Sequence, residues 1–250
     1  MPVTETRPYD PLRAAVYALA ALLFFLSAAH ASPEDGRAPA GPSAESIVAR
    51  LMEANRTRAA RIRRYTATRT YHAVNYKSKK SAEMRVRVNF ESPDAKRFEV
   101  LSEQGSHIIR KRVFDSLMAA EIEAAHPGIK HRSAIHTDNY RFERIGEEVL
   151  AGRRSYVLQA EPRRTDRYLW RGRLWIDAED FAVAKIKGQP AKSPSFWTRK
   201  VEIERDYLKM GDFWLPARDA SQSDIRIFGK SSVLIEYFDY QLETSESKSP

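Results

Sequence analysis

Hydrophobic and polar side chains alternate most regularly in the first half of the chain. Met84, Val86, Val88 and Phe90 alternate with charged or polar neighbours. A period of two is typical of a strand with one buried and one solvated face. The preceding segment YTATRTYHAVNY is rich in Thr and Tyr and predicts a partner strand, with YKSKKS as the turn between them. A third strand is predicted where the alternation continues, at Phe98 and Val100.

A helical period precedes these strands. Four residues fall at i+4 spacing, with Val48 and Met52 alongside them: Ile47, Leu51, Asn55 and Ala59. Ser43 or Ser46 is the expected N-cap. The other faces carry Arg50, Arg56, Arg58 and Arg61. This segment is therefore expected to be an amphipathic helix with a basic outer side.

A second helix is predicted over residues 106–125. Its apolar side is expected to contain Ile109, Val113, Leu117 and Ile122. The helix is expected to end near His126-Pro127-Gly128, because Pro and Gly stop helices.

Strand patterns then continue to the end of the chain. The candidates are 139–149, 153–161, 167–177, 181–187, 197–208, 213–223 and 231–242. Tight turns separate them and leave no room for crossover helices, so the strands are expected to form an antiparallel meander. The predicted fold class is α+β: a long curved antiparallel sheet, a half-open barrel, with an N-terminal helix and an inserted helix covering the concave face.

The N-terminal region has the features of a secretory signal peptide. Arg7 and Arg13 precede the apolar run AAVYALAALLFFLSAA, which ends in Ala29-His30-Ala31. The run is shorter than the roughly 20 residues of a membrane span, although a retained anchor is the alternative. We expect a signal peptide over 1–31, a flexible linker rich in Pro, Gly and Ala over 32–43, and one domain over 44–250. The expected localisation is the bacterial periplasm.

Net charge and amino-acid composition limit the classes of binding partner and of chemistry that the chain could have. The chain has a net charge of +9, and the predicted signal peptide holds two basic and two acidic residues, so its removal leaves that value unchanged. In an exported protein this charge favours anionic head groups or acidic envelope polymers over nucleic acid. The chain has no cysteine, which excludes thiol catalysis, Cys-ligated zinc and a lipid-modified N-terminal Cys.

The sequence pattern indicates no particular residues for catalysis or metal binding. His126, His131 and His136 are expected in a solvated loop, and Asp177, Glu179 and Asp180 in an acidic turn that lacks the calcium-loop pattern. No G-x-S-x-G, H-E-x-x-H or Gly-rich phosphate loop is present. Basic and aromatic residues alternate near Trp170, which could suit nucleic acid, but the wet face of a strand is the favoured interpretation. We expect no cofactor and no enzymatic activity.

The order of helix, three strands, helix and strand meander resembles the LolA/LolB family of periplasmic lipoprotein carriers. Two segments carry the local resemblance: GRLWIDAEDFAVAKIKGQP at 172–190 and YLKMGDFWLPARDASQSDIRIFGKSSVLIEYFDYQ at 207–241. The resemblance implies a half-open barrel with a lid of helices and an apolar interior that holds acyl chains. The family's lid-locking arginine is assigned to no residue of this sequence.

An acyl chain needs an apolar trough lined by inward strand positions. The candidate lining residues are Met84, Val86, Val88, Phe90, Phe98, Tyr140, Phe142, Tyr156, Leu158, Tyr168, Trp170, Leu174 and Ile176. Gly172 is expected to leave room beside Trp170 on the same face. The alternative is that these residues form an ordinary dry core.

The sequence therefore favours a non-enzymatic periplasmic carrier of lipid or lipoprotein acyl chains, with outer-membrane lipoprotein sorting as one such role. The expected partners are acyl chains and membrane-bound donor or acceptor proteins, and the chain is expected to be a monomer. Two alternatives stay open: an envelope sensor or protein-interaction module of the same fold, and a secreted hydrolase.

Overall fold

The structure is a computed structural model that describes residues 41–193, 198–227 and 229–245. The predicted signal peptide, residues 32–40 of the predicted linker and Trp197 lie outside the described residues. Within the described ranges, no helix combines the length and the apolar character needed to cross a membrane.

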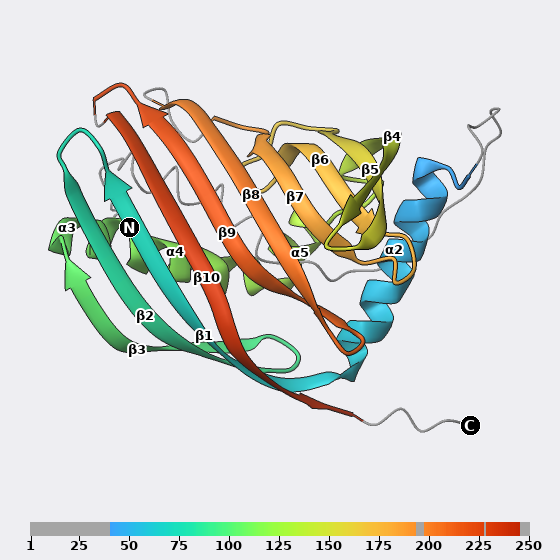
Figure 1. Cartoon of the computed structure of the whole chain (residues 1–250), viewed down its shortest axis with the longest axis horizontal. Helices are drawn as coiled ribbons and strands as arrows, with labels where there is room; N and C mark the ends of the chain where they lie inside the picture. Colours follow the sequence, from blue (N-terminus) through green and yellow to red (C-terminus); the bar gives the residue numbers. More distant parts are fainter. Residues whose placement is uncertain (1–40, 194–197, 228, 246–250) are drawn as a thin grey trace, which may run out of the picture.

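A ten-stranded antiparallel sheet forms the body of the molecule, in the order β3-β2-β1-β10-β9-β8-β7-β6-β5-β4. The strands are β1 (Ile62–Asn75), β2 (Lys80–Glu91), β3 (Ala95–Gly105), β4 (Tyr140–Leu150), β5 (Arg153–Pro162), β6 (Trp170–Asp177), β7 (Val183–Pro190), β8 (Thr198–Met210), β9 (Phe213–Ile225) and β10 (Gly229–Thr244). Because β1 pairs with β10, the first and last strands lie side by side in mid-sheet, and the edges β3 and β4 stay apart. Figure 1 shows the long, curved sheet. The predicted fold class is confirmed.

Helices cover one side of this sheet (Figure 1). Helix α2 (Ala44–Arg61) precedes β1, while α3 (His107–Ile109), α4 (Asp115–Ala125) and α5 (Pro127–Ser133) lie between β3 and β4. Ser43 is the N-cap of α2, and its side chain accepts a hydrogen bond from the Ser46 amide at 3.2 Å. Ile47 and Leu51 are buried as the helical period predicts, together with Val48 and Met52.

The inserted helix differs from its prediction. A five-residue π-helical segment, Arg110–Phe114, separates α3 from α4. Val113 and Leu117 are buried, but Ile122 is 48% exposed, contrary to the prediction. Ile122 follows Leu117 by five residues, which places it about 140° around an α-helix of 100° per residue. The helix instead buries Ala120, Glu121 and Ala124.

The segment after α4 is not the solvated loop that was expected. Pro127 begins α5 at a position where a helix needs no amide donor, so this proline starts a helix as well as ending one. His136 is buried, and its Nδ1 accepts a hydrogen bond from the Asp138 amide at 2.9 Å.

Strand ends lie within three residues of the predicted ones, with two consequences for side chains. Val100 is exposed although it pairs with the buried Val86, because it lies on the edge strand β3, whose second half is exposed throughout. Tyr168 precedes β6 instead of lying in it, and its hydroxyl donates to Glu123 of α4 at 2.7 Å.

The middle of the concave face is filled. Ile47, Val48 and Leu51 of α2 belong to the same core cluster as Trp170 and Leu174 of β6. On β1, the ring of Tyr71 packs against that of Phe114 with 5.6 Å between centroids. Any ligand space must therefore lie toward the ends of the strands.

Candidate functional site

Two cavities flank the filled core. Alternate residues of β1 show the arrangement: Arg69 lines one cavity, Tyr71 is buried in the core, and Ala73 lines the other. The first, here called the α2 cavity, has a volume of about 450 Å³ and is bordered by the C-terminal half of α2. The second, here called the hairpin cavity, has about 540 Å³ and lies at the β1–β2 and β9–β10 turns beside α3.

Aromatic side chains form much of the wall of the α2 cavity. They are Tyr65, Phe90, Tyr207, Phe213, Trp214 and Tyr240. Tyr65 and Phe90 stack with their centroids 4.9 Å apart. The lining reaches from Lys96 on β3 to Val183 on β7, seven neighbouring strands of the sheet. At about 4.8 Å per strand this is roughly 29 Å along the sheet, so the cavity is an elongated apolar trough.

Cations dominate the polar part of this lining. The basic residues are Arg56, Arg58, Arg69, Lys96, Lys130 and Arg205, and Glu121 is the acidic member of the same lining. The cavity therefore combines apolar walls with an excess of positive charge.

Glu121 connects the inserted helix to the sheet. Its carboxylate accepts hydrogen bonds from Arg69 Nη1 at 2.6 Å and Nη2 at 2.9 Å, and from Lys96 Nζ at 2.6 Å. Burial alone would raise the pKa of Glu121, but the charges and hydrogen bonds of Arg69 and Lys96 hold it at about 2. Arg69 and Lys96 thus keep Glu121 ionised at this end of the cavity.

A second buried ion pair lies beneath the trough. Arg205 of β8 donates two hydrogen bonds to Asp219 of β9, and the hydroxyl of Tyr237 on β10 donates to the same carboxylate. Despite the cost of burial, the charge of Asp219 raises the pKa of Arg205 above its usual value. Because this cation is matched by Asp219, it adds little net charge to the cavity.

Lys130 of α5 stands at the same end as Lys96. It is half-buried, and burial lowers its pKa, with Asp94 opposing this effect and Lys96 adding to it. Partial burial removes part of the water around an ammonium group, so an anion would be a favourable neighbour here.

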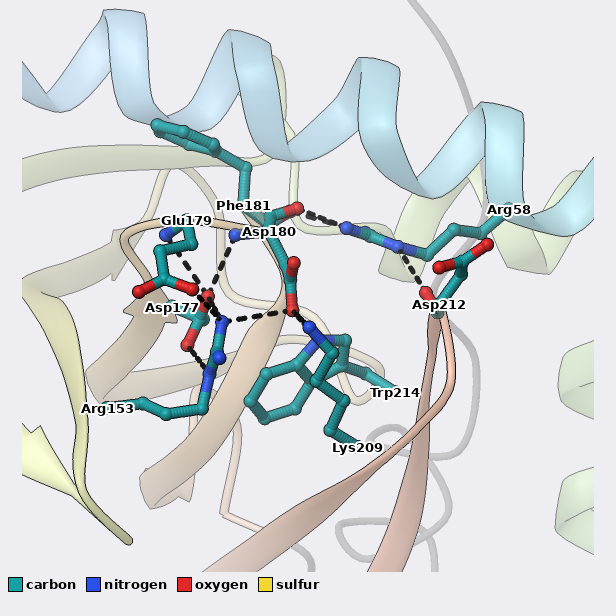
Figure 2. A network of polar contacts seen from close by, with 9 residues as sticks. All are labelled: Arg58, Arg153, Asp177, Glu179, Asp180, Phe181, Lys209, Asp212 and Trp214. Atoms are coloured by element: carbon teal, nitrogen blue, oxygen red, sulfur yellow. Dashed lines mark hydrogen bonds and ion pairs between the residues drawn. The ribbon is translucent and has the colours of Figure 1, made fainter.

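Polar contacts hold the helical wall of the cavity (Figure 2). Arg58 of α2 donates to the carbonyls of Asp180 and Phe181 in the β6–β7 turn, and to that of Asp212 in the β8–β9 turn at 3.1 Å. Arg61 reaches the Asp212 carboxylate at 3.0 Å. These two arginines therefore face the turns and not the outer side of the helix, contrary to the prediction.

The acidic β6–β7 turn is a structural element of this wall. Asp177 is fully buried and accepts from Arg153 at 2.6 and 2.8 Å and from the amides of Glu179 and Asp180 (Figure 2). Asp180 in turn accepts from Lys209 at 2.6 Å and from the Trp214 indole at 2.9 Å. Within the described part of the chain, no group of three or more His, Cys, Asp or Glu residues is placed to hold a metal ion.

The residues predicted to line a ligand trough lie mostly in the filled core. Core members are Met84, Val86, Tyr140, Tyr156, Leu158, Trp170, Leu174 and Ile176, with Phe98 and Phe142 packed against them. Val88 is buried as well, and Tyr168 is buried beside α4. Phe90 lines the α2 cavity.

Gly172 leaves no room for a ligand. A Cβ at this position would lie 2.2 Å from the Lys187 carbonyl oxygen, because Gly172 faces Gly188 across β6 and β7. The two glycines permit a close approach of the backbones, and the Trp170 ring covers Gly188. The predicted gap beside Trp170 is therefore filled.

Sequence reasoning misses most of the cavity residues. The sequence pattern indicates Phe213, Trp214 and Leu215 only as the start of a strand, and Tyr65 only as part of a strand segment. Their signal is position: these aromatic and aliphatic side chains occur close to strand ends, where the sheet extends beyond the packed core.

No protein-family model matches the chain, and no curated protein matches it significantly. Among solved structures, a DUF1329 family protein from Desulfovibrio piger is 10% identical, with a TM-score of 0.42 over 83% of this chain and 95% of that one. A putative outer membrane lipoprotein-sorting protein domain from Vibrio parahaemolyticus is 15% identical, with a TM-score of 0.40 over 78% and 93%. A LolA superfamily protein from Nitrosomonas europaea is 12% identical, with a TM-score of 0.35 over 83% and 97%.

At these identities and TM-scores, the similarities carry no argument about a ligand. One of these structures is a LolA superfamily protein, and LolA/LolB is the family that the sequence motifs of this chain resemble.

Proposed function

We propose that the chain is a non-enzymatic periplasmic carrier that holds the acyl chains of a lipid or lipoprotein in the α2 cavity. The observation that carries this proposal is the elongated aromatic trough between α2 and the strand ends. Its volume of about 450 Å³ falls in the usual range for small-molecule sites. Each buried methylene contributes about 0.8 kcal/mol, so an acyl chain is held by burial without any chemical step.

Release requires one wall to move, and the C-terminal half of α2 is suited to this. The N-terminal half is anchored by the buried apolar residues Ile47, Val48 and Leu51. The C-terminal half meets the turns through Arg58 and Arg61, whose hydrogen bonds water can replace. A membrane-bound donor or acceptor protein would act on this half of the helix.

Trp214 reports on the cavity directly, because its indole is part of the lining. Titration with a fatty-acyl ligand is expected to shift tryptophan emission in the parent protein and in Trp175→Phe. The shift should disappear in Trp214→Phe, since Trp175 lies outside the lining, with its indole bonded to Glu148 at 2.9 Å.

A cavity-filling pair of variants tests the location. Ala59 lines the cavity, whereas Thr57 on the same helix is exposed and outside the lining. Ala59→Trp is expected to abolish acyl-ligand binding with little loss of thermal stability, and Thr57→Trp to leave binding unchanged. Equal binding by both variants would place the ligand elsewhere.

The hairpin cavity favours a second candidate, a protein-interaction module. Ile108 and Ile227, both 53% exposed, form part of its rim. Exposed apolar residues beside a cavity are typical of an interaction surface. Absence of acyl-ligand binding by the parent protein would leave this candidate as the better account.

A further inference from the structure

We propose that the ligand of the α2 cavity is an anionic amphiphile, whose carboxylate or phosphate head lies between Lys96 and Lys130 while its acyl chain follows the aromatic wall. This inference rests on the proposed carrier function and adds the chemical class of the cargo. It separates a fatty acid or anionic phospholipid from a neutral acylated molecule.

The charge balance at this end of the cavity supports an anion. Arg69, Lys96 and Lys130 line this end of the cavity, with Glu121 as the carboxylate in the same lining. Asp94, in the exposed β2–β3 turn, acts on Lys130 from the solvent side. Basic residues therefore outnumber carboxylates in this lining, and an anionic head group would be a favourable neighbour for the half-buried Lys130.

The position of these cations relative to the apolar wall gives the ligand a direction. Lys96 Nζ is 6.0 Å from the ring centroids of both Tyr65 and Phe90, which stack on each other. The charged end of the trough is therefore continuous with its aromatic wall. From there the lining continues along the strand ends through Tyr240 and Leu215. An anionic head at Lys96 would therefore place its acyl chain against these aromatic and aliphatic side chains.

Lys130 is the better residue to test, because Lys96 also holds Glu121 in place. A lysine ammonium offers three hydrogen-bond donors to a carboxylate or phosphate oxygen. Such charge-assisted hydrogen bonds are roughly twice as strong as neutral ones. Lys130 is half-buried, so its replacement is expected to leave the fold intact.

The experiment compares matched ligands by calorimetry on the full chain. Palmitate is paired with its methyl ester, and palmitoyl lysophosphatidylglycerol with monopalmitoylglycerol, so that carboxylate and phosphate heads are separate arms. The parent protein is expected to prefer at least one anion over its neutral partner by about tenfold or more. Added NaCl should reduce this preference.

Three variants assign the preference to the site. Lys130→Gln is expected to lose most of it while keeping its affinity for the neutral ligands, and Lys130→Arg to retain it. Lys187→Gln removes an exposed lysine of β7 outside the lining and should behave as the parent.

The outcomes separate the two proposals. Equal affinity of the parent for anionic and neutral partners, or equal preference in Lys130→Gln and Lys187→Gln, would overturn the anionic assignment and leave the carrier function standing. Failure of the parent to bind any of the four amphiphiles would overturn both.

Discussion

At the scale of single residues, Glu121 shows how the inserted helix is held on the sheet. It is 1% exposed and bonded to both Arg69 and Lys96. Glu121→Gln removes the negative charge between two buried cations. Breaking a buried ion pair in this way costs about 3–5 kcal/mol. Urea unfolding at pH 7 measures the cost, with exposed Glu99→Gln, which removes a surface pair with Arg87, as the matched control.

The same residue predicts a pH dependence. The pKa of Glu121 falls from 4.5 to about 2 on folding, so its ionisation stabilises the native state fully above about pH 4.5. This contribution is lost as pH falls from 4.5 toward 2, and the stability difference between parent and Glu121→Gln should shrink over that window. A difference that stays constant between pH 6 and pH 2.5 would contradict this assignment.

Gly172 allows the backbones of β6 and β7 to approach each other closely. Its φ is +148°, and an added Cβ would lie only 2.2 Å from the Lys187 carbonyl oxygen, so both features exclude a larger side chain. Gly172→Ala is therefore expected to lower the free energy of unfolding by about 2 kcal/mol or more. Gly146→Ala on β4, where a Cβ would meet nothing within 4 Å, should change it by less than about 1 kcal/mol. Similar melting temperatures for the two variants would contradict the close strand approach.

At the scale of elements, the two halves of α2 are held differently. Buried apolar residues hold the N-terminal half, and hydrogen bonds to two turns hold the C-terminal half. Arg58→Leu removes the contacts to both turns and is expected to speed amide hydrogen exchange at residues 55–61, because this half then opens more often. Residues 47–52 should keep their protection, since their contacts are apolar and buried. Arg56→Leu is the matched control, because Arg56 is exposed and pairs with Glu53 on its own helix. Uniform exchange along α2 in both variants would contradict this division.

The elements also show what the sequence could predict. Alternation around Val86 and the i+4 stripe of residues 47–51 locate β2 and α2 well, because one face of each is fully buried. The π-helical segment and α5 escaped prediction, the second because its proline begins a helix where the sequence pattern predicts only an end. The network of Arg58, Asp180 and Asp212 joins residues more than 120 positions apart, so no local pattern could reveal it.

At the scale of the whole molecule, the side chains between the sheet and the helices fill the centre of the concave face and leave cavities toward the strand ends. Inward strand positions predicted the core well, and their apolar character could not separate core from cavity. Leu174 belongs to the same packed core cluster as the buried face of α2, while Phe90 and Phe213 lie close to strand ends and line the cavity. The cavity residues could therefore be identified only from the three-dimensional arrangement.

The carrier function makes one claim above all others: the α2 cavity holds an acylated molecule in the cell. Native mass spectrometry of the chain, purified without detergent from the cells that produce it, measures this directly. We expect the parent protein to carry an adduct with the mass of an anionic acyl lipid, and the Ala59→Trp variant to lack it. A mass spectrum in which the parent protein has no lipid adduct would contradict the account, and so would an adduct that persists unchanged in Ala59→Trp.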